Sequence, residues 1–401
     1  MTIKPTILAP VWALLVAYCA WATFLPVGAK YLALLGSALV ALVVLQRQHR
    51  LGELRHDRAF IAAAAFYALT LISVLWSSGA PHEIGPQLWL YAMLLLSPLI
   101  ALACPPELAR FGLRQFALAA AVVGGAVILA RVHALPEGWV WASSVEADGN
   151  QRIVTSLMLA LGATMAVQEG LRPAVMARVE RGAWLAGAVI AGIGLALQDR
   201  RTGMVALPVL LAVYGLARLR SVGQRAAVVV AVIALCGLAW AASPVVRAHI
   251  GEGLHEMQTY ESSDRADTSW GMRLRLAEHT IDMIRERPLL GHGVASWLGQ
   301  WRQRVTPGLW ISRHLTPHNE YLQVAAQLGA AGIVLLLWLL LGNAAQAWRA
   351  GPDGHAALLV WTAIAWTGFF NVVIRDSKFA LPLLMLAGLA GAVSRNAPRR
   401  R

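Results

Sequence analysis

The sequence predicts an all-α, polytopic membrane protein with about 12 transmembrane helices and one long loop outside the membrane. Of its 401 residues, 58% are hydrophobic and only 14% are charged, and the mean hydropathy is +0.58. Apolar stretches of membrane-spanning length recur along the chain, and a water-compatible stretch at 243–320 separates two of them. The net charge of +13 reflects arginines in short loops, which indicates membrane topology rather than a nucleic-acid partner.

Twelve apolar stretches have about the length that crosses a hydrocarbon core of ~30 Å. The first lacks a small-residue cleavage site, so we expect a retained helix rather than a signal peptide. Three domains are predicted: transmembrane helices 1–9 in residues 1–242, the long loop with amphipathic helices in 243–320, and transmembrane helices 10–12 with a short basic tail in 321–401. The stretches are 6–25, 30–45, 59–76, 87–104, 112–131, 153–168, 182–198, 203–217, 226–242, 321–341, 355–374 and 378–394.

Basic residues predict the orientation of these helices. With the N-terminus in the cytoplasm, 18 lysines and arginines fall in inside segments and 7 in short outside loops, whereas long loops are exempt from the rule. We therefore expect both termini in the cytoplasm and the 243–320 loop outside. In a bacterial inner membrane, that loop would lie in the periplasm, among membrane lipids.

The sequence gives no sign of a metal or a cofactor. Cys19, Cys104 and Cys236 all lie in or beside apolar stretches, which indicates neither a disulfide framework nor a zinc site. The short outer loops contain no paired carboxylates, and Asp264 and Asp267 are isolated in the long loop. We therefore predict chemistry that is independent of metal ions.

The long loop contains an amphipathic helix at 270–288 with one charge, Arg273, on its apolar face. A guanidinium buried without an anion is unfavourable, so either a carboxylate from the loop or a bound anion should meet it. Arg275 lies on the solvated face with Glu278 and Asp282, where a local ion pair is the simpler interpretation. The residues that share the face of Arg273 are Leu276, Ala277, Thr280, Ile281, Met283 and Ile284.

Two other places on the expected outer face carry polar residues without a topology role. Arg200 and Arg201 follow Asp199 in a tight turn, where they either pair with that acid and with headgroups or form an anion clamp with Arg273. His318 precedes an apolar helix and could either cap it or act as a general base. Nearby arginines would lower the pKa of the imidazole and keep it able to accept a proton.

Two arginine sites and one histidine on the same face indicate a reaction in which a diphosphate leaves while a hydroxyl is deprotonated. The loop tryptophans Trp297, Trp301 and Trp310 either stack on sugar rings or belong to a segment lying on the bilayer. A transporter is the alternative from a different class, but no matched pair of Pro- or Gly-interrupted spans supports it.

Three motifs together resemble the O-antigen ligase and O-antigen polymerase superfamily, over roughly residues 195–345. His318-Asn319-Glu320-Tyr321-Leu322-Gln323, followed by Gln327-Leu328-Gly329-Ala330-Ala331-Gly332, is similar to its histidine-asparagine signature with two spaced glycines. The run from Gly271-Met272-Arg273 to Pro288-Leu289-Leu290-Gly291-His292-Gly293 resembles its long-loop motif, and Arg201-Thr202-Gly203 resembles its short-turn arginine. Ala277 stands where many relatives carry a tryptophan, so we expect different packing under Arg273.

The resemblance is strongest to the O-antigen ligases. It implies a GT-C-like glycosyltransferase fold, an undecaprenyl-diphosphate-linked O-antigen donor, a lipid A-core acceptor, and inverting, metal-independent transfer. It also implies catalytic roles for Arg201, Arg273 and His318. Our candidates for substrate binding are Arg200, Arg275, Asn319, Trp297 and Trp301. An O-antigen polymerase, which uses the same donor to extend a second donor-linked glycan, remains the close alternative.

Overall fold

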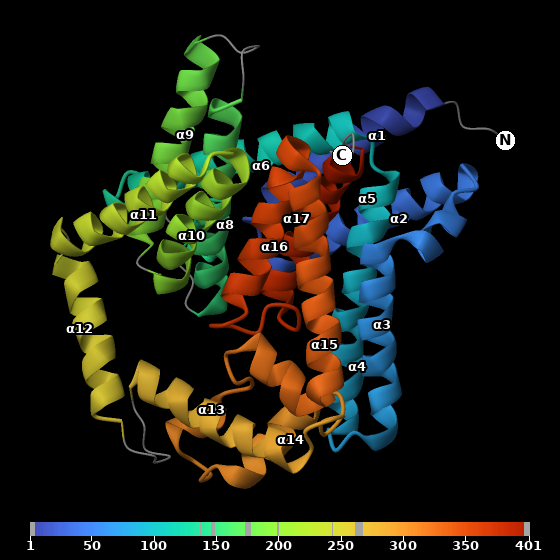
Figure 1. Cartoon of the computed structure of the whole chain (residues 1–401), viewed down its shortest axis with the longest axis vertical. Helices are drawn as coiled ribbons and strands as arrows, with labels where there is room; N and C mark the ends of the chain where they lie inside the picture. The colour runs from blue at the N-terminus through green and yellow to red at the C-terminus, as the bar shows by residue number, and fades with distance from the viewer. Residues whose placement is uncertain are drawn as a thin grey trace.

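The computed structural model describes residues 5–136, 138–145, 149–172, 178–198, 200–242, 244–260 and 268–396. Asp199, Asp264, Asp267, the first residue of the predicted loop at 243 and the end of the basic tail lie outside these ranges. All regular secondary structure in the described residues is helical (Figure 1). The predicted all-α class is therefore confirmed for this part of the chain.

Most of the described residues lie in α-helices. They are α1 (Pro5–Ala22), α2 (Val27–Arg47), α3 (Arg58–Ile72), α4 (Pro81–Ala92), α5 (Leu96–Ala103), α6 (Pro106–Arg131), α7 (Ala142–Val145), α8 (Asn150–Gly170), α9 (Arg178–Leu197), α10 (Arg201–Arg218), α11 (Val222–Ala242), α12 (Pro244–Gln258), α13 (Ser269–Glu286), α14 (Ser296–Arg304), α15 (Glu320–Arg349), α16 (His355–Thr367) and α17 (Ser377–Arg395). Short 3-10 helices include η2 (Ser73–Trp76) and η4 (Trp310–Arg313).

Each of the 12 predicted spans overlaps a helix, but the count of 12 is not confirmed. Within the described residues, nine helices are long and apolar enough to cross a membrane. The apolar parts of α1 and α11 that can be described, Pro10–Ala22 and Val222–Leu238, are shorter. The predicted span 355–374 is helical over only the 13 residues of α16. Thirteen residues rise about 20 Å, which is less than the ~30 Å of a hydrocarbon core.

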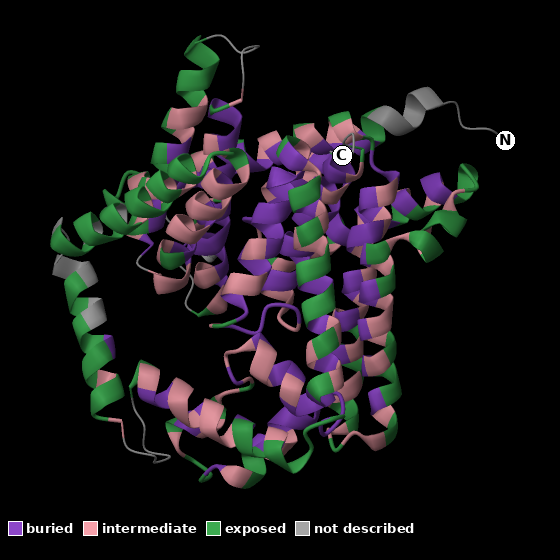
Figure 2. Cartoon of the chain, viewed as in Figure 1, coloured by how far each residue is buried: buried purple, intermediate pink, exposed green. Residues whose placement is uncertain are grey.

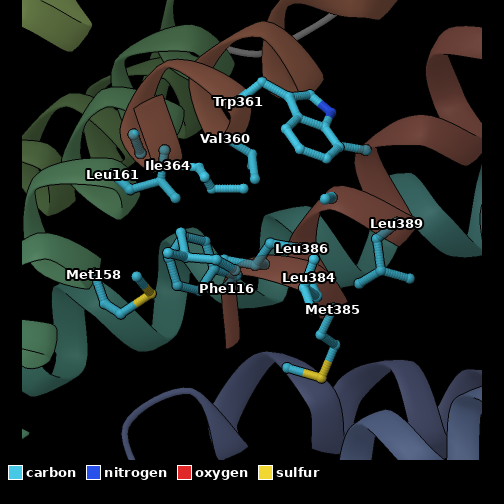
Figure 3. Packing of buried hydrophobic residues seen from close by; sticks show 14 of the residues in the cluster. Phe116, Met158, Leu161, Val360, Trp361, Ile364, Leu384, Met385, Leu386 and Leu389 are labelled. Atoms are coloured by element: carbon cyan, nitrogen blue, oxygen red, sulfur yellow. The ribbon is translucent and has the colours of Figure 1, made fainter. Parts of the chain in front are cut away.

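The core of the bundle lies where helices distant in sequence meet. In the apolar 18-residue stretches of α8 and α17, 89% and 83% of the residues are buried, so other helices surround both of them (Figure 2). Phe116 of α6, Met158 of α8 and Leu386 of α17 lie in this core together with Ile364 of α16 (Figure 3). The outer helices bury a smaller share and keep apolar side chains on the surface, as lipid-facing helices do.

The segment 288–293 of the long loop docks into a break in α15. The break lies at Gly329, whose φ of 62° is not helical. Four backbone hydrogen bonds join the two segments: His292 and Gly293 donate to the carbonyls of Ala326 and Gln327 (3.0 and 2.8 Å), and Ala330 and Ala331 donate to those of Pro288 and Leu289 (2.8 and 3.2 Å). The loop thus pairs backbone groups that the interrupted helix would leave without partners.

Two glycines allow this close approach. Gly291 and Gly329 both have positive φ, and a Cβ on either would overlap the backbone of the opposite segment, at Gln327 and Leu289 respectively. The two glycine-containing motifs of the sequence, 288–293 and 327–332, are therefore the two halves of one contact.

We expect Gly329→Ala to destabilise the protein by about 2–4 kcal/mol, because the left-handed backbone and the overlap with Leu289 both oppose a side chain there. The midpoint of thermal unfolding in detergent should fall, and limited proteolysis of the 243–320 loop should speed up. Gly342→Ala is the matched control in the same helix, since its Cβ would meet only Trp338, at an ordinary 3.5 Å. A Gly329→Ala protein as stable as the Gly342→Ala protein would contradict this account of the break.

Candidate active site

The long loop forms a second, smaller core that includes α13 and α14. As predicted, Leu276, Thr280 and Met283 of α13 are buried, but Ile281 is 38% exposed, so the apolar face is narrower than the sequence indicated. Thr268 caps α13 by accepting a hydrogen bond from the backbone NH of Gly271 (3.1 Å). The buried members of this core are Met272, Leu276, Met283, Trp297, Leu298, Trp301, Val305, Ile311 and Ala326.

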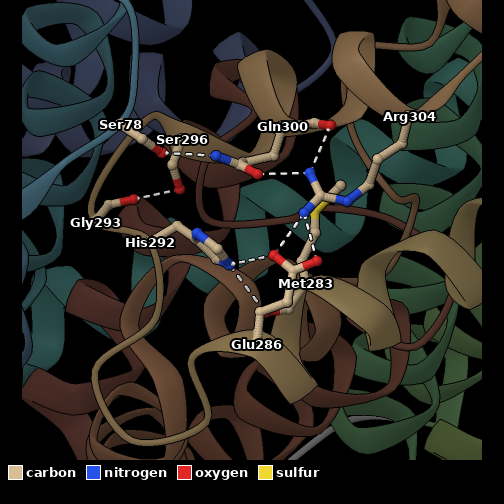
Figure 4. Close-up of polar contacts among 8 residues, drawn as sticks. All are labelled: Ser78, Met283, Glu286, His292, Gly293, Ser296, Gln300 and Arg304. Carbon is tan, nitrogen blue, oxygen red and sulfur yellow. Dashed lines mark hydrogen bonds and ion pairs between the residues drawn. The ribbon is translucent and has the colours of Figure 1, made fainter.

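A polar network fixes the position of α13 (Figure 4). Nε2 of His292 donates to the carbonyl oxygen of Met283 at the end of α13 (2.9 Å). Arg304 of α14 donates to Glu286 (2.7 Å). Gln300 of α14 donates to the hydroxyl of Ser78, which lies between η2 and α4 (3.1 Å). Both loop helices are thereby held to one another and to the membrane bundle.

Trp297 and Trp301 belong to this small core and are not placed to bind a sugar. Their side chains are only 1% and 0% exposed, and the two rings stack on one another with centroids 5.6 Å apart. The Trp297 indole donates to the hydroxyl of Thr280 (2.9 Å). Because neither ring offers a face to a ligand, the structure does not support substrate binding by either tryptophan.

Arg273 lies in the first turns of α13 and has no hydrogen-bonded acidic partner among the residues that the structure describes. Its side chain makes no hydrogen bond or ion pair with a described residue, and its Nε is enclosed. The guanidinium stands 6.0 Å from the centre of the Trp270 ring. Trp270 thus gives Arg273 an aromatic neighbour, although Ala277 stands where many relatives carry a tryptophan. Burial and, next, the charge of Arg201 lower the pKa of Arg273, whereas Glu256 raises it. The alternative of a structural ion pair is not realised in the described residues.

Glu256 of α12 is the nearby acid, but its carboxylate serves the start of α13. Its Oε2 accepts a hydrogen bond from the backbone NH of Trp270 (2.8 Å). A carboxylate at a helix N-terminus interacts favourably with the helix dipole. Arg273 is therefore close to a negative charge without being bound to it.

Arg201 is the first residue of α10 and comes from a different part of the chain. Its side chain is 40% exposed and its Nη2 lies 3.2 Å from Oε2 of Glu252, which is 59% exposed. Because the charge of Arg201 lowers the pKa of Arg273, the two guanidinium groups lie near one another. Arg200 precedes α10 with an extended backbone, and its Nε is enclosed without a hydrogen-bond partner among the described residues.

His318 has an unusual backbone and a histidine neighbour. Its φ of 51° lies in the left-handed region, a conformation that bulky residues adopt mainly where the surroundings enforce it. Its Nε2 lies 3.2 Å from Nδ1 of His314. Burial, then His314, then Arg273 lower the pKa of His318 to about 4. The ring is therefore neutral near pH 7, as the sequence analysis expected.

His314 is a residue of this cluster that the sequence analysis did not identify. Its ring packs edge-on against Trp310, with centroids 4.8 Å apart. Burial and then the charge of Arg273 lower the pKa of His314. The spacing of the two histidines would have been the only signal, and the segment between them is not helical, so no periodicity connects them.

Asn319 and Arg275 have local partners. Asn319 caps α15: its Oδ1 accepts from the backbone NH of Leu322 (2.9 Å), and its Nδ2 donates to the carbonyl of Phe369 (3.1 Å). The capping role considered for His318 thus belongs to Asn319, whose amide is engaged at both ends. Arg275 pairs with Glu278 on its own helix (3.0 Å), which matches the simpler interpretation.

Arg375, one of the seven basic residues counted in the short outside loops, also supports the site. Its Nη1 donates to the carbonyl of Leu315 (2.9 Å) and ties the histidine segment to the loop before α17. Among the residues that the structure describes, no three His, Cys, Asp or Glu side chains form a group that could hold a metal ion. Metal independence stays a prediction.

The three candidate catalytic residues lie in a stretch that is similar to a known protein family. The model of the O-antigen ligase family matches residues 186–337, which include Arg201, Arg273 and His318. No curated protein matches the chain. The resemblance of the three motifs to the O-antigen ligase and O-antigen polymerase superfamily is thus confirmed, and residues 186–337 of this chain are similar to that family.

Proposed function

We propose that this protein is an O-antigen ligase, which transfers an O-antigen glycan from undecaprenyl diphosphate to a hydroxyl of lipid A-core. The observation that carries the proposal is Arg273, a half-buried cation that forms no ion pair with any acid in the described part of the chain. It lies near Arg201, and its charge also reaches His318, within the stretch that matches the family.

The arginines would hold the diphosphate of the donor. A guanidinium binds phosphate oxygens through two parallel hydrogen bonds and stabilises the charge that develops on a leaving group. The Arg201–Glu252 pair is exposed, and such pairs are worth about 0–1 kcal/mol, so a diphosphate can replace Glu252 at low cost. Arg273 would gain an anionic partner that the described residues do not supply.

His318 would take the proton from the acceptor hydroxyl. A neutral imidazole can accept a proton, whereas the imidazolium cannot. The hydroxyl oxygen attacks the anomeric carbon from the side opposite the diphosphate, which inverts the configuration there. A bound diphosphate offsets the charge of Arg273 and so raises the pKa of His318, which makes it a stronger base in the complex than in the free protein.

We further propose that the site faces the periplasm from the inner membrane. The basic residues counted in the sequence support this orientation. At the end of α15 remote from the loop, Arg110 pairs with Asp353 (3.0 Å), in the part of the chain expected in the cytoplasm. The donor would then be used on the side of the membrane where the loop and its helices lie.

We expect Arg201→Ala, Arg273→Ala and His318→Asn to insert and fold normally but to lower glycan transfer by about 10²-fold or more. Asparagine is chosen at 318 because it tolerates the left-handed backbone. The readout is the capping of lipid A-core by labelled donor, seen in a lipopolysaccharide gel. Arg285→Ala is the matched control, because this arginine of α13 is 76% exposed and should leave transfer unchanged.

Full transfer by the Arg273→Ala protein would remove Arg273 from the mechanism. The acceptor distinguishes the two branches of the superfamily in the same assay. A polymerase would lengthen a second donor-linked glycan and leave lipid A-core uncapped, which would contradict the ligase assignment while keeping the site.

The pH dependence of transfer should show two different acid limbs. Activity falls with falling pH as His318 becomes protonated. The pH dependence of kcat/KM reports the free protein, in which the pKa of His318 is lowered to about 4. The kcat/KM for the donor should therefore persist below pH ~6.5, where an ordinary histidine would be half protonated. The acid limb of kcat should lie at higher pH, because the bound diphosphate offsets Arg273. A kcat/KM limb at about 6.5 would contradict this electrostatic environment.

A further inference from the structure

We propose that His314 is a second proton carrier in this site: it holds His318 in the tautomer that can accept a proton and passes that proton to the departing diphosphate. This inference rests on the proposed glycosyl transfer. The observation behind it is the 3.2 Å contact between Nδ1 of His314 and Nε2 of His318. A contact between two neutral rings at this distance needs one proton between the nitrogens, and its direction decides what His318 can do.

Only one direction leaves His318 able to act as a base. If Nδ1 of His314 donates, the lone pair of His318 Nε2 is used and the proton of His318 is on its Nδ1. No lone pair then remains for the acceptor hydroxyl. If instead Nε2 of His318 donates, its Nδ1 keeps a lone pair and can take the proton. His314 must therefore accept at Nδ1 and carry its own proton on Nε2.

The position of His314 Nε2 points to a ligand. This atom is enclosed and has no hydrogen-bond partner among the described residues. An enclosed NH without an acceptor costs about 1–3 kcal/mol, so we expect an acceptor when substrate is bound. The charge of Arg273 acts on His314, and Arg273 is the group proposed to hold the diphosphate. A phosphate oxygen held there would be the acceptor for this NH.

The transfer of protons then balances with the transfer of the glycan. The acceptor oxygen forms its bond to the anomeric carbon as the bond from that carbon to the phosphate oxygen breaks. The hydroxyl proton moves to Nδ1 of His318, the proton on its Nε2 moves to Nδ1 of His314, and the proton on His314 Nε2 moves to the leaving phosphate. Both rings end neutral in the other tautomer, and exchange with water restores the first after the products leave.

The charges around the two rings favour such a relay. Arg273 of α13 acts on both histidines, Arg201 of α10 lies beside Arg273, and Arg375 contacts the carbonyl of Leu315. The nearby acids, Glu252 and Glu256, are engaged with Arg201 and with the start of α13. An imidazolium among these cations would be unfavourable, and passing the proton to a phosphate that gains negative charge avoids it.

The test compares His314→Gln with His314→Phe. Glutamine can accept from His318 and donate to a ligand but cannot pass on a proton, whereas phenylalanine keeps the ring against Trp310 and removes both hydrogen bonds. We expect His314→Gln to lower kcat about 10- to 100-fold, the range of one general acid–base step, with a nearly unchanged KM for the donor. His314→Phe should lose transfer about as completely as His318→Asn. His82→Gln, a 78% exposed histidine, is the control and should leave transfer unchanged.

The decisive readout is the dependence of kcat on the fraction of D₂O. In the wild type more than one proton moves, so the plot should be curved, and in His314→Gln it should become linear. A wild-type kcat in His314→Gln, or a linear plot in the wild type, would overturn the relay. Thermal unfolding in detergent confirms that both variants are folded. If the wild type caps no lipid A-core but extends a donor-linked glycan, the ligase proposal fails, and the same comparison tests His314 with that acceptor.

Discussion

The backbone contact between the 288–293 segment and the broken turn of α15 determines the geometry of the site. Arg273 lies on α13, which ends just before this segment, and His318 lies just before the first turn of α15. The four hydrogen bonds across the contact therefore fix the position of one residue relative to the other. Gly291 and Gly329 are required because the two backbones touch where side chains would otherwise be. The polar network of Figure 4 holds the loop side of this contact to the bundle.

The electrostatics of the site follow from this forced proximity. Arg273 and two histidines are held together beside a second arginine. Besides burial, the charge of Arg201 lowers the pKa of Arg273, and the charge of Arg273 lowers the pKa of both histidines. Such an arrangement is unfavourable in an empty protein and becomes favourable when an anion enters. On the proposed mechanism, the loop core would thus maintain a charge distribution that is suited to a bound diphosphate.

Periodicity predicted what depends on local sequence. The helix at 270–288 and the place of Arg273 on it could be read from the spacing of apolar residues, and the positions of the spans from their length. Periodicity could not show that Trp297 and Trp301 are buried. The sequence around a tryptophan in a loop does not distinguish a ring in a core from a ring that faces a ligand. It also missed His314, which lies in an irregular segment, and the shortness of α16, which depends on where the chain turns at Gly368. The pairing of the two glycine motifs is a contact between segments about 38 residues apart, and no local pattern encodes it.

The exposed pair of Arg201 and Glu252 has a consequence for lipid selection on the proposed mechanism. Glu252 acts as a resident counterion, so any anionic lipid must displace it before reaching Arg201. A phospholipid with a single phosphate would compete with this carboxylate for one guanidinium and gain little. A pyrophosphate can bridge both arginines and gain the second as well. Because the exposed pair is worth only about 0–1 kcal/mol, the preference for a diphosphate lipid over the abundant single-phosphate headgroups would come from the second guanidinium.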